Sequence, residues 1–168
     1  MEYRTAQLHL ETSKLMGVDF IPIGTTPSSQ DKQSLLDELC VDHDASCPHC
    51  TSSTGHTNIV FGTGNPDASL MFIGEAPGME EDLQGVPFVG AAGKKLDQII
   101  EAMGLYRTDV YIANTLKSRP PDNRTPTPDE VAACGPYLKS QIEIISPSVI
   151  VTLGSPASKY ILETTNGI

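Results

Sequence analysis

Hydrophobic residues in this chain form three short, continuous runs separated by segments with helical spacing. They predict strands at residues 69–73, 109–113 and 148–153, because mostly apolar runs of this length are typical of strands buried on both faces. The pattern predicts helices at 91–103, 128–145 and 155–162, and leucines at positions 35, 36 and 39 begin an earlier amphipathic helix. This alternation predicts an α/β fold, a three-layer αβα sandwich with a parallel central sheet.

The chain divides near residue 33. Residues 1–33 contain a short helical pattern at 5–16 and a stretch rich in Gly, Pro, Ser and Thr at 24–29, which predicts an N-terminal arm and a flexible linker. Residues 34–168 are long enough and apolar enough to bury the core of one domain. No run reaches the roughly 20 apolar residues of a membrane span, and no signal-peptide pattern is visible. We therefore expect a cytoplasmic protein without a membrane partner, and we expect it to be a monomer.

Loops rich in glycine and polar residues follow the predicted strands. The first strand runs into Gly74-Glu75-Ala76-Pro77-Gly78, and a second glycine turn follows at 88–93. The other two strands lead into Asn114 and Gly154. Ligands of open α/β sheets bind beyond the carboxyl ends of the strands. The sequence thus predicts a binding site at this rim, and the alternative is a set of loops that only connect strands to helices.

A proline-rich basic loop follows Asn114. Its prolines favour an extended course that exposes Lys117, Arg119 and Arg124, and such cations suit phosphate contacts. The formal net charge of −10 opposes a nucleic-acid binder of the basic-stripe type. Residues 1–90, however, hold 3 Lys and Arg against 13 Asp and Glu, whereas residues 91–145 hold 7 of each. The pattern permits a basic mouth on an acidic body, or a solvated loop with chance charges.

Three cysteines could converge on a metal ion or cluster. Cys47 and Cys50 are separated by two residues, and Cys134 lies on a predicted helix that folding could return to them. The alternative is a buried Cys134 that packs as a small hydrophobic residue. The four histidines, His9, His43, His49 and His56, all precede the predicted site, and we expect them on the surface.

Taken in this order, the motifs resemble those of the family-4 uracil-DNA glycosylases, over residues from about 35 to 162. The matching positions are 74–78, 81–82, 87–90, 93, 96, 111–114, 119–121, 123–124, 134 and 154. The resemblance implies a DNA repair enzyme that flips uracil out of DNA and hydrolyses its N-glycosidic bond. Uracil-containing DNA would be its partner. Two other functions remain open: a non-catalytic nucleic-acid-binding module of the same fold, and an enzyme that acts on free nucleosides or nucleotides.

The resemblance also implies roles for residues of the base pocket. Phe88 would stack on uracil, and Asn114 would read its O4 and N3–H. The loop at Gly74 and Ala76 would bind the base, with the backbone N–H groups of residues 75 and 76 on the base oxygen.

Further roles concern the reaction and the DNA backbone. Glu75 would organise the loop through a hydrogen bond to Asn123, and Glu81 would orient or deprotonate water. The alternative for residues 80–82 is a solvated run of charge. Lys117, Arg119 and Arg124 would contact the DNA backbone.

Two departures from the family pattern bear on the cofactor and on the extent of the domain. The family holds a four-iron four-sulfur cluster with four cysteines; Cys47, Cys50 and Cys134 match three of them, but Ser118 stands at the fourth position. A serine oxygen is a poorer iron ligand than a thiolate, so an intact cluster would need Cys40, His49, Ser118 or an external ligand. We expect a weakly held cluster or none, with zinc as a further alternative. The family's late His-Pro motif has no counterpart, and we expect that the C-terminal part of the domain is missing from this sequence.

Overall fold

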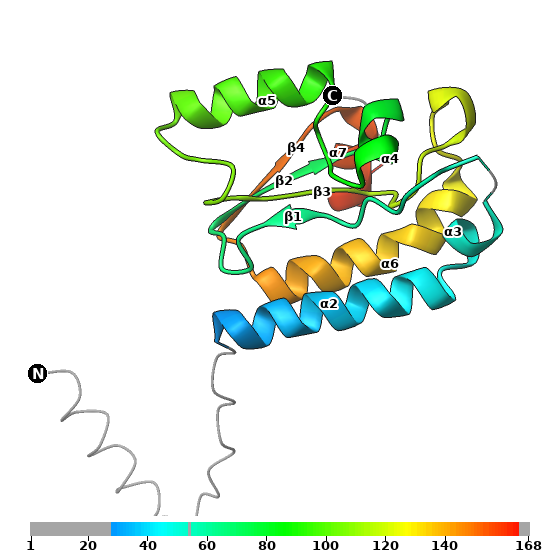
Figure 1. The fold of residues 1–168 in the computed structure, drawn as a ribbon, viewed down its shortest axis with the longest axis horizontal. Helices are drawn as coiled ribbons and strands as arrows, with labels where there is room; N and C mark the ends of the chain where they lie inside the picture. Colours follow the sequence, from blue (N-terminus) through cyan, green and yellow to red (C-terminus); the bar gives the residue numbers. More distant parts are fainter. Residues whose placement is uncertain (1–27, 54, 165–168) are drawn as a thin grey trace, which may run out of the picture.

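The computed structural model describes residues 28–53 and 55–164, and their centre is a four-stranded sheet (Figure 1). Its strands are β1 (Thr63–Gly64), β2 (Leu70–Gly74), β3 (Tyr111–Asn114) and β4 (Val149–Thr152), in the order β1-β3-β2-β4. The β2 strand pairs in parallel with β3 and β4, whereas β1 pairs antiparallel with β3. The α/β class is confirmed, but the sheet is mixed. A two-residue strand leaves no hydrophobic run in the sequence, which is why β1 was not predicted.

Helices cover both faces of the sheet, as expected for three layers. They are α2 (Ser29–Ser46), α3 (Pro48–Ser52), α4 (Met79–Gln84), α5 (Ala91–Ala102), α6 (Pro128–Ile145) and α7 (Ser155–Ile161), with a 3₁₀ turn η1 at Pro121–Asn123. In Figure 1, α5 lies on one side of the sheet, and α2 and α6 lie side by side on the other. The helices predicted at 91–103, 128–145 and 155–162 are confirmed to within one residue.

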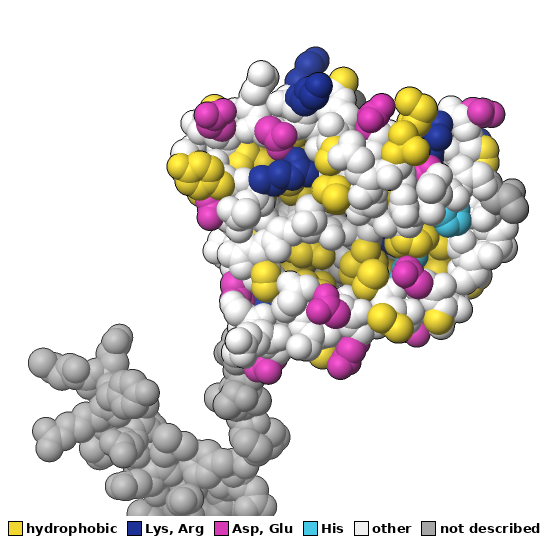
Figure 2. All heavy atoms as spheres, viewed as in Figure 1, with side chains coloured by type: hydrophobic (Ala, Val, Ile, Leu, Met, Phe, Trp, Pro, Cys, Tyr) yellow, Lys and Arg dark blue, Asp and Glu magenta, His cyan; other side chains and the backbone are white. Residues whose placement is uncertain are grey.

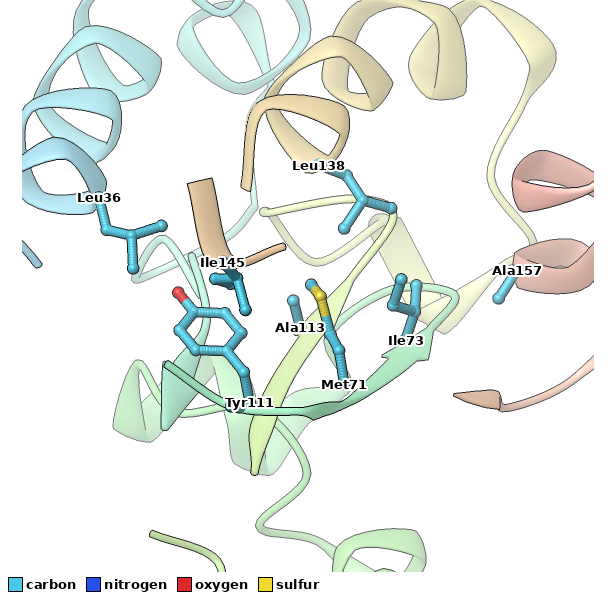
Figure 3. Packing of buried hydrophobic residues seen from close by; sticks show 9 residues of the cluster. Leu36, Met71, Ile73, Tyr111, Ala113, Leu138, Ile145 and Ala157 are labelled. Carbon is cyan, nitrogen blue, oxygen red and sulfur yellow. The ribbon is translucent and has the colours of Figure 1, made fainter. Parts of the chain in front are cut away.

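Side chains that alternate along β2 and β3 build two cores. Met71 and Ile73 point to the same side as Tyr111, toward Leu36 of α2 and helix α6 (Figure 3). The intervening residues of both strands face α5 and its buried Leu96 and Ile100. Burial on both faces explains the continuous apolar runs of β2 and β3. The same expectation is wrong for β4, where Val149 is exposed and the other residues are only partly buried.

The first described helix begins inside the segment predicted to be a linker. Ser28 caps α2: its hydroxyl accepts from the N–H of Asp31, whose carboxylate accepts from the N–H of Ser28. Residues 29–33 are therefore helical. The part of the predicted arm before residue 28, with its expected helix at 5–16, lies outside the described residues.

Charge is unevenly spread over the surface. In Figure 2, which has the orientation of Figure 1, Lys and Arg side chains gather in the upper half of the visible face, whereas Asp and Glu side chains also line the lower edge, where α2 lies. Among the described helices, none combines the length and apolar character that a bilayer crossing requires.

Candidate functional site

The loops that follow β2 and β3 meet at one rim of the sheet. Gly74 and Asn114 are partners in the parallel ladder, so both strands end side by side. Beyond the ladder, the N–H of Thr115 donates to the carbonyl of Gly74 at 2.9 Å, and the N–H of Leu116 donates to that of Glu75 at 3.0 Å. The structure therefore brings together the two loops that the sequence predicted at this rim.

Gly74 lies against Phe88 and Asn114 with no room for a side chain. A Cβ atom at this position would lie 2.5 Å from Cζ of Phe88 and closer still to Oδ1 of Asn114. Asn114 is only 1% exposed, and its Oδ1 has no hydrogen-bond partner among the described residues. An unpaired buried acceptor costs about 1–3 kcal/mol, so a fold that retains one commonly uses it for a ligand. The aromatic ring and the free amide oxygen meet at this glycine.

The backbone at Phe88 has an uncommon conformation, and hydrogen bonds from Arg107 hold it there. Its φ is +53°, a region that bulky residues seldom occupy. The guanidinium of Arg107 donates to the carbonyls of Pro87 and Phe88, and it also pairs with Asp97 at 2.6 Å. Arg107 was missed at the sequence level because nothing in its local pattern distinguishes it from a surface arginine.

Glu81 ties the two glycine loops together. Its Oε2 accepts from the N–H of Gly78 at 3.1 Å, and its Oε1 accepts from those of Val89 and Gly90, both at 2.9 Å. Next to it, Asp82 is buried and accepts from the N–H groups of Thr57 and Asn58. The hypothesis of a solvated charge run is therefore wrong for both carboxylates. With three backbone donors on Glu81, its geometry suits loop positioning better than the activation of water.

Glu75 lines a pocket at the same rim. The pocket has a volume of about 290 Å³ and is lined by Glu75, Ala76, Pro77, Gly78, Pro120, Asn123, Arg124 and Thr125. Burial raises the pKa of the Glu75 carboxyl above its usual value. The expected hydrogen bond from Asn123 to Glu75 is absent from the described contacts, and Asn123 Oδ1 instead accepts from Nε of Arg119 at 2.7 Å.

Lys117 does not lie on the surface. It is fully buried, and its ammonium donates to the carbonyl of Asn114 at 2.8 Å and to Oε1 of Gln141 at 2.5 Å. Its Nζ also lies 5.4 Å from the ring centre of Phe61. Burial lowers the pKa of Lys117 to about 7. The prediction that Lys117 contacts DNA is therefore wrong, because the apolar stem and the hydrogen bonds hold the cation inside the domain.

The other two cations of this loop are at its surface. Arg124 is exposed and forms a two-bond ion pair with Glu130, at 2.6 and 2.8 Å. This pair lowers the pKa of Glu130 to about 2, mainly through the hydrogen bonds from Arg124. Arg119 is partly exposed and bonds Asn123 within its own loop. Arg124 lines the pocket of Glu75, and Arg119 is linked to it through Asn123, which also lines the pocket.

Three cysteines and a histidine from helices α2, α3 and α6 and the junction of α2 and α3 converge at a buried site. Sγ of Cys134 lies 3.5 Å from that of Cys47, 3.3 Å from that of Cys50 and 4.0 Å from Nε2 of His43. The four ligand atoms all lie within 4.8 Å of one another, and all four residues are buried. This group could bind a metal ion. The expectation that His43 lies on the surface is wrong; its spacing of four residues before Cys47 on a predicted helix was the signal that could have revealed it.

Ser118 lies beside this group. Its hydroxyl is 3.3 Å from Sγ of Cys50 and 3.2 Å from Nε2 of His49. The fourth cysteine, Cys40, lies outside the converging group. The three predicted cysteine positions thus meet in space, and His43 joins them.

Comparison with known proteins relates the chain to one superfamily. The family described as the uracil DNA glycosylase superfamily matches residues 61–167. The chain is similar to the type-4 uracil-DNA glycosylase of Archaeoglobus fulgidus, with 55% identity over 116 residues, which are 69% of this chain and 58% of that protein. The enzyme of the same name from Thermotoga maritima is 48% identical over 128 residues, or 76% of this chain and 67% of that protein.

A third relative has the highest identity of these three. It is the type-4 uracil-DNA glycosylase of Sulfurisphaera tokodaii, 56% identical over 117 residues, which are 69% of this chain and 53% of that protein. The chain thus spans between about half and two thirds of the length of these relatives.

Proposed function

Because the chain belongs to the uracil-DNA glycosylase superfamily, we propose that it removes uracil from DNA by hydrolysing the N-glycosidic bond of a flipped nucleotide. One observation carries this proposal: the buried Oδ1 of Asn114, which has no hydrogen-bond partner within residues 28–53 and 55–164, meets the ring of Phe88 at the crowded Cα of Gly74. An aromatic face beside a buried amide suits a planar base that carries both a donor and an acceptor on its edge.

Asn114 would select uracil through the polarity of its amide. Its Oδ1 accepts from N3–H of uracil, and its Nδ2 donates to O4. Cytosine presents an acceptor at N3 and a donor at the exocyclic amine. The acceptor Oδ1 would then face an acceptor and the donor Nδ2 a donor, so neither hydrogen bond could form. Each buried group left unpaired costs about 1–3 kcal/mol. Phe88 adds stacking of about 1–3 kcal/mol, which every base would receive.

Glu75 is the carboxylate best placed to assist bond cleavage. As the bond breaks, positive charge develops on the sugar and negative charge on the base. Glu75 lines the pocket with Asn123, whereas the oxygens of Glu81 are bound by three backbone N–H groups. In this proposal Glu75 orients water or stabilises the sugar cation, and the N–H groups of residues 75 and 76 stabilise the base anion. Asn123 lines the same pocket but bonds Arg119 and not Glu75. Glu81 holds the loops that carry these groups.

Arg119 and Arg124 would supply the backbone contacts to uracil-containing DNA. Arg124 lines the pocket of Glu75 and Arg119 bonds Asn123 of its lining, so both cations lie near the position proposed for the flipped nucleotide. Neither cation reads a base, and their contribution is expected to be independent of sequence.

The four-iron cluster that the resemblance implies does not fit the donor set of this chain. Each thiolate of such a cluster binds a different iron, and here only three thiolates converge while Ser118 offers a hard hydroxyl. None of the proposed steps requires a metal, because the groups that face the base pocket belong to the rim of the sheet.

The test is release of uracil from an oligonucleotide that contains one uracil, in single-stranded form and opposite guanine. We expect the 168-residue protein to release uracil and to leave cytosine and thymine in matched oligonucleotides. Binding of a DNA in which the uracil nucleotide resists hydrolysis is measured in parallel, against a thymine control. A protein that neither releases uracil nor prefers the uracil-containing DNA contradicts the proposal, and base release from free deoxyuridine alone would favour a nucleoside enzyme.

A further inference from the structure

The converging cysteines come from segments far apart in the chain. His43 lies in α2, Cys47 at the junction of α2 and α3, Cys50 in α3 and Cys134 in α6. The exposed fractions are 0% for His43, Cys47 and Cys134 and 5% for Cys50. Apolar side chains, including Leu116 and Ala76, pack around the three cysteines. Four soft or borderline donors in a dry, closed site are typical of a structural metal centre.

The donor atoms are gathered closely enough for one ion: all four lie within 4.8 Å of one another. In a tetrahedral zinc site with Zn–S bonds of about 2.3 Å, neighbouring sulfurs are about 3.8 Å apart. The sulfur of Cys134 lies 3.3 Å from that of Cys50 and 3.5 Å from that of Cys47, with Nε2 of His43 at 4.0 Å. Thiolates that bind different corners of a four-iron cube would be farther apart than this.

A second hydrogen bond orients His43 for this role. Its Nδ1 lies 3.1 Å from Oδ1 of Asp44, so the ring can donate Nδ1–H to the carboxylate and turn the lone pair of Nε2 toward the sulfurs. Ligating histidines usually have such a carboxylate or carbonyl partner on the other ring nitrogen. His49 is arranged differently, since its Nε2 faces the hydroxyl of Ser118 at 3.2 Å.

We propose that His43, Cys47, Cys50 and Cys134 bind one Zn²⁺ ion, and that His43 replaces the ligand which the serine at position 118 cannot supply. The ion would join α2 and α3 to α6 behind the loop that carries Ala76. Three thiolates and Zn²⁺ carry a net charge of −1, and the buried ammonium of Lys117, next to Ser118 in the chain, offsets part of it. The role is structural, because three protein thiolates and an imidazole leave no open position for a substrate.

The first test is the metal content of the 168-residue protein purified without added metal. We expect about one zinc per chain and no acid-labile sulfide. X-ray absorption should show three sulfurs at about 2.3 Å and one nitrogen at about 2.0–2.1 Å. Four irons with sulfide in each chain would overturn the proposal, and so would a metal-free protein with titratable thiols or a disulfide between Cys50 and Cys134.

Variants then identify the fourth ligand. His43→Ala should weaken zinc binding by at least about 100-fold and replace nitrogen by a water oxygen in the cobalt-substituted spectrum, while Asp44→Asn should weaken it by about 10- to 100-fold. His49→Ala is the matched control and should change neither affinity nor spectrum. Circular dichroism verifies that each variant is folded. If His43→Ala does not fold, the zinc affinity of Asp44→Asn still tests the role of His43, because Asp44 orients the His43 ring. An unchanged affinity in both His43→Ala and Asp44→Asn would overturn the assignment of His43.

A gain of function provides the converse test. Ser118→Cys restores the fourth thiolate of the family pattern, next to Cys50. When supplied with iron and sulfide under reducing conditions, this variant should acquire the absorbance of a four-iron cluster, and the unmodified chain should not. If both proteins acquire the cluster equally, Ser118 is no barrier and the zinc proposal fails.

Discussion

The proposed base pocket and the cysteine site lie in the same domain, and their geometry predicts a very different tolerance of change. At the pocket, Gly74, Phe88 and Asn114 touch so closely that no side chain can be added to Gly74. At the cysteine site, Ser118 replaces one thiolate of the family pattern, and His43 of α2 lies next to Cys134 of α6. A planar base requires groups in fixed positions and polarities, whereas a metal ion requires only that enough suitable donors converge. Ligand exchange is therefore the easier change.

The largest expected effect is at Asn114. If the pocket tolerated substitution of this residue, the contrast with the cysteine site would not hold. Asn114→Ala removes both hydrogen bonds to the base edge and should lower uracil release by about 100-fold, since two hydrogen bonds of about 1–2 kcal/mol are lost. Release of cytosine relative to uracil should rise. Phe88→Ala is the control: it should lower release of every base alike, because stacking does not discriminate. Equal base selectivity in the two variants would contradict the assignment.

Gly74→Ala tests whether crowding at the pocket is as severe as the geometry indicates. The new methyl group would overlap with Phe88 and Asn114, and overpacking of this kind costs about 1–3 kcal/mol. We expect a loss of uracil binding together with a lower midpoint of urea unfolding. Gly90→Ala adds the same methyl group at a position where the nearest atom, Oε1 of Glu81, would be 3.3 Å away, and it should have the smaller effect. The reverse order of effects would show that the rim adapts readily.

Variants of Glu81 and of its neighbour Glu80 distinguish a loop-positioning role from the effect of surface charge. Glu81→Gln exchanges one acceptor for a donor that faces a backbone N–H, and it should reduce the free energy of unfolding by about 1–3 kcal/mol. Glu80 is exposed, and Glu80→Gln should change the free energy of unfolding by less than about 0.5 kcal/mol. If Glu81→Gln lowers base release without lowering stability, Glu81 acts on water after all.

The smallest effect concerns DNA affinity at the edge of the pocket. Arg119→Ala should reduce the slope of log affinity against log salt by about 0.9, the value for one lost phosphate contact on duplex DNA. Lys117→Met keeps the length of the buried stem and should leave that slope unchanged, because Lys117 is fully buried. A flatter slope in Lys117→Met would show that the loop opens on DNA and exposes this cation.

The sequence predicted the layered fold because its buried strands leave continuous apolar runs and its helices leave periodic ones. It also predicted that the loops at Gly74 and Asn114 meet, since parallel strands end at the same edge. The burial of Lys117 could not be predicted, because it depends on Gln141, 24 residues away. The role of Arg107 likewise depends on carbonyls about 20 residues distant. Long-range partners of single polar side chains leave no local pattern.

The left-handed backbone at Phe88 has a consequence for the kinetics of the reaction. Arg107 holds this strained turn in the folded protein, and the absence of a side chain at Gly93 leaves room for it, so the conformation is formed during folding and not when DNA binds. If the proposed function is correct, the pocket is already formed when DNA binds, and the opening of the base pair is expected to be the slow step. Capture should accordingly proceed faster at a uracil mispaired with guanine than at one paired with adenine, in proportion to how often each pair opens on its own.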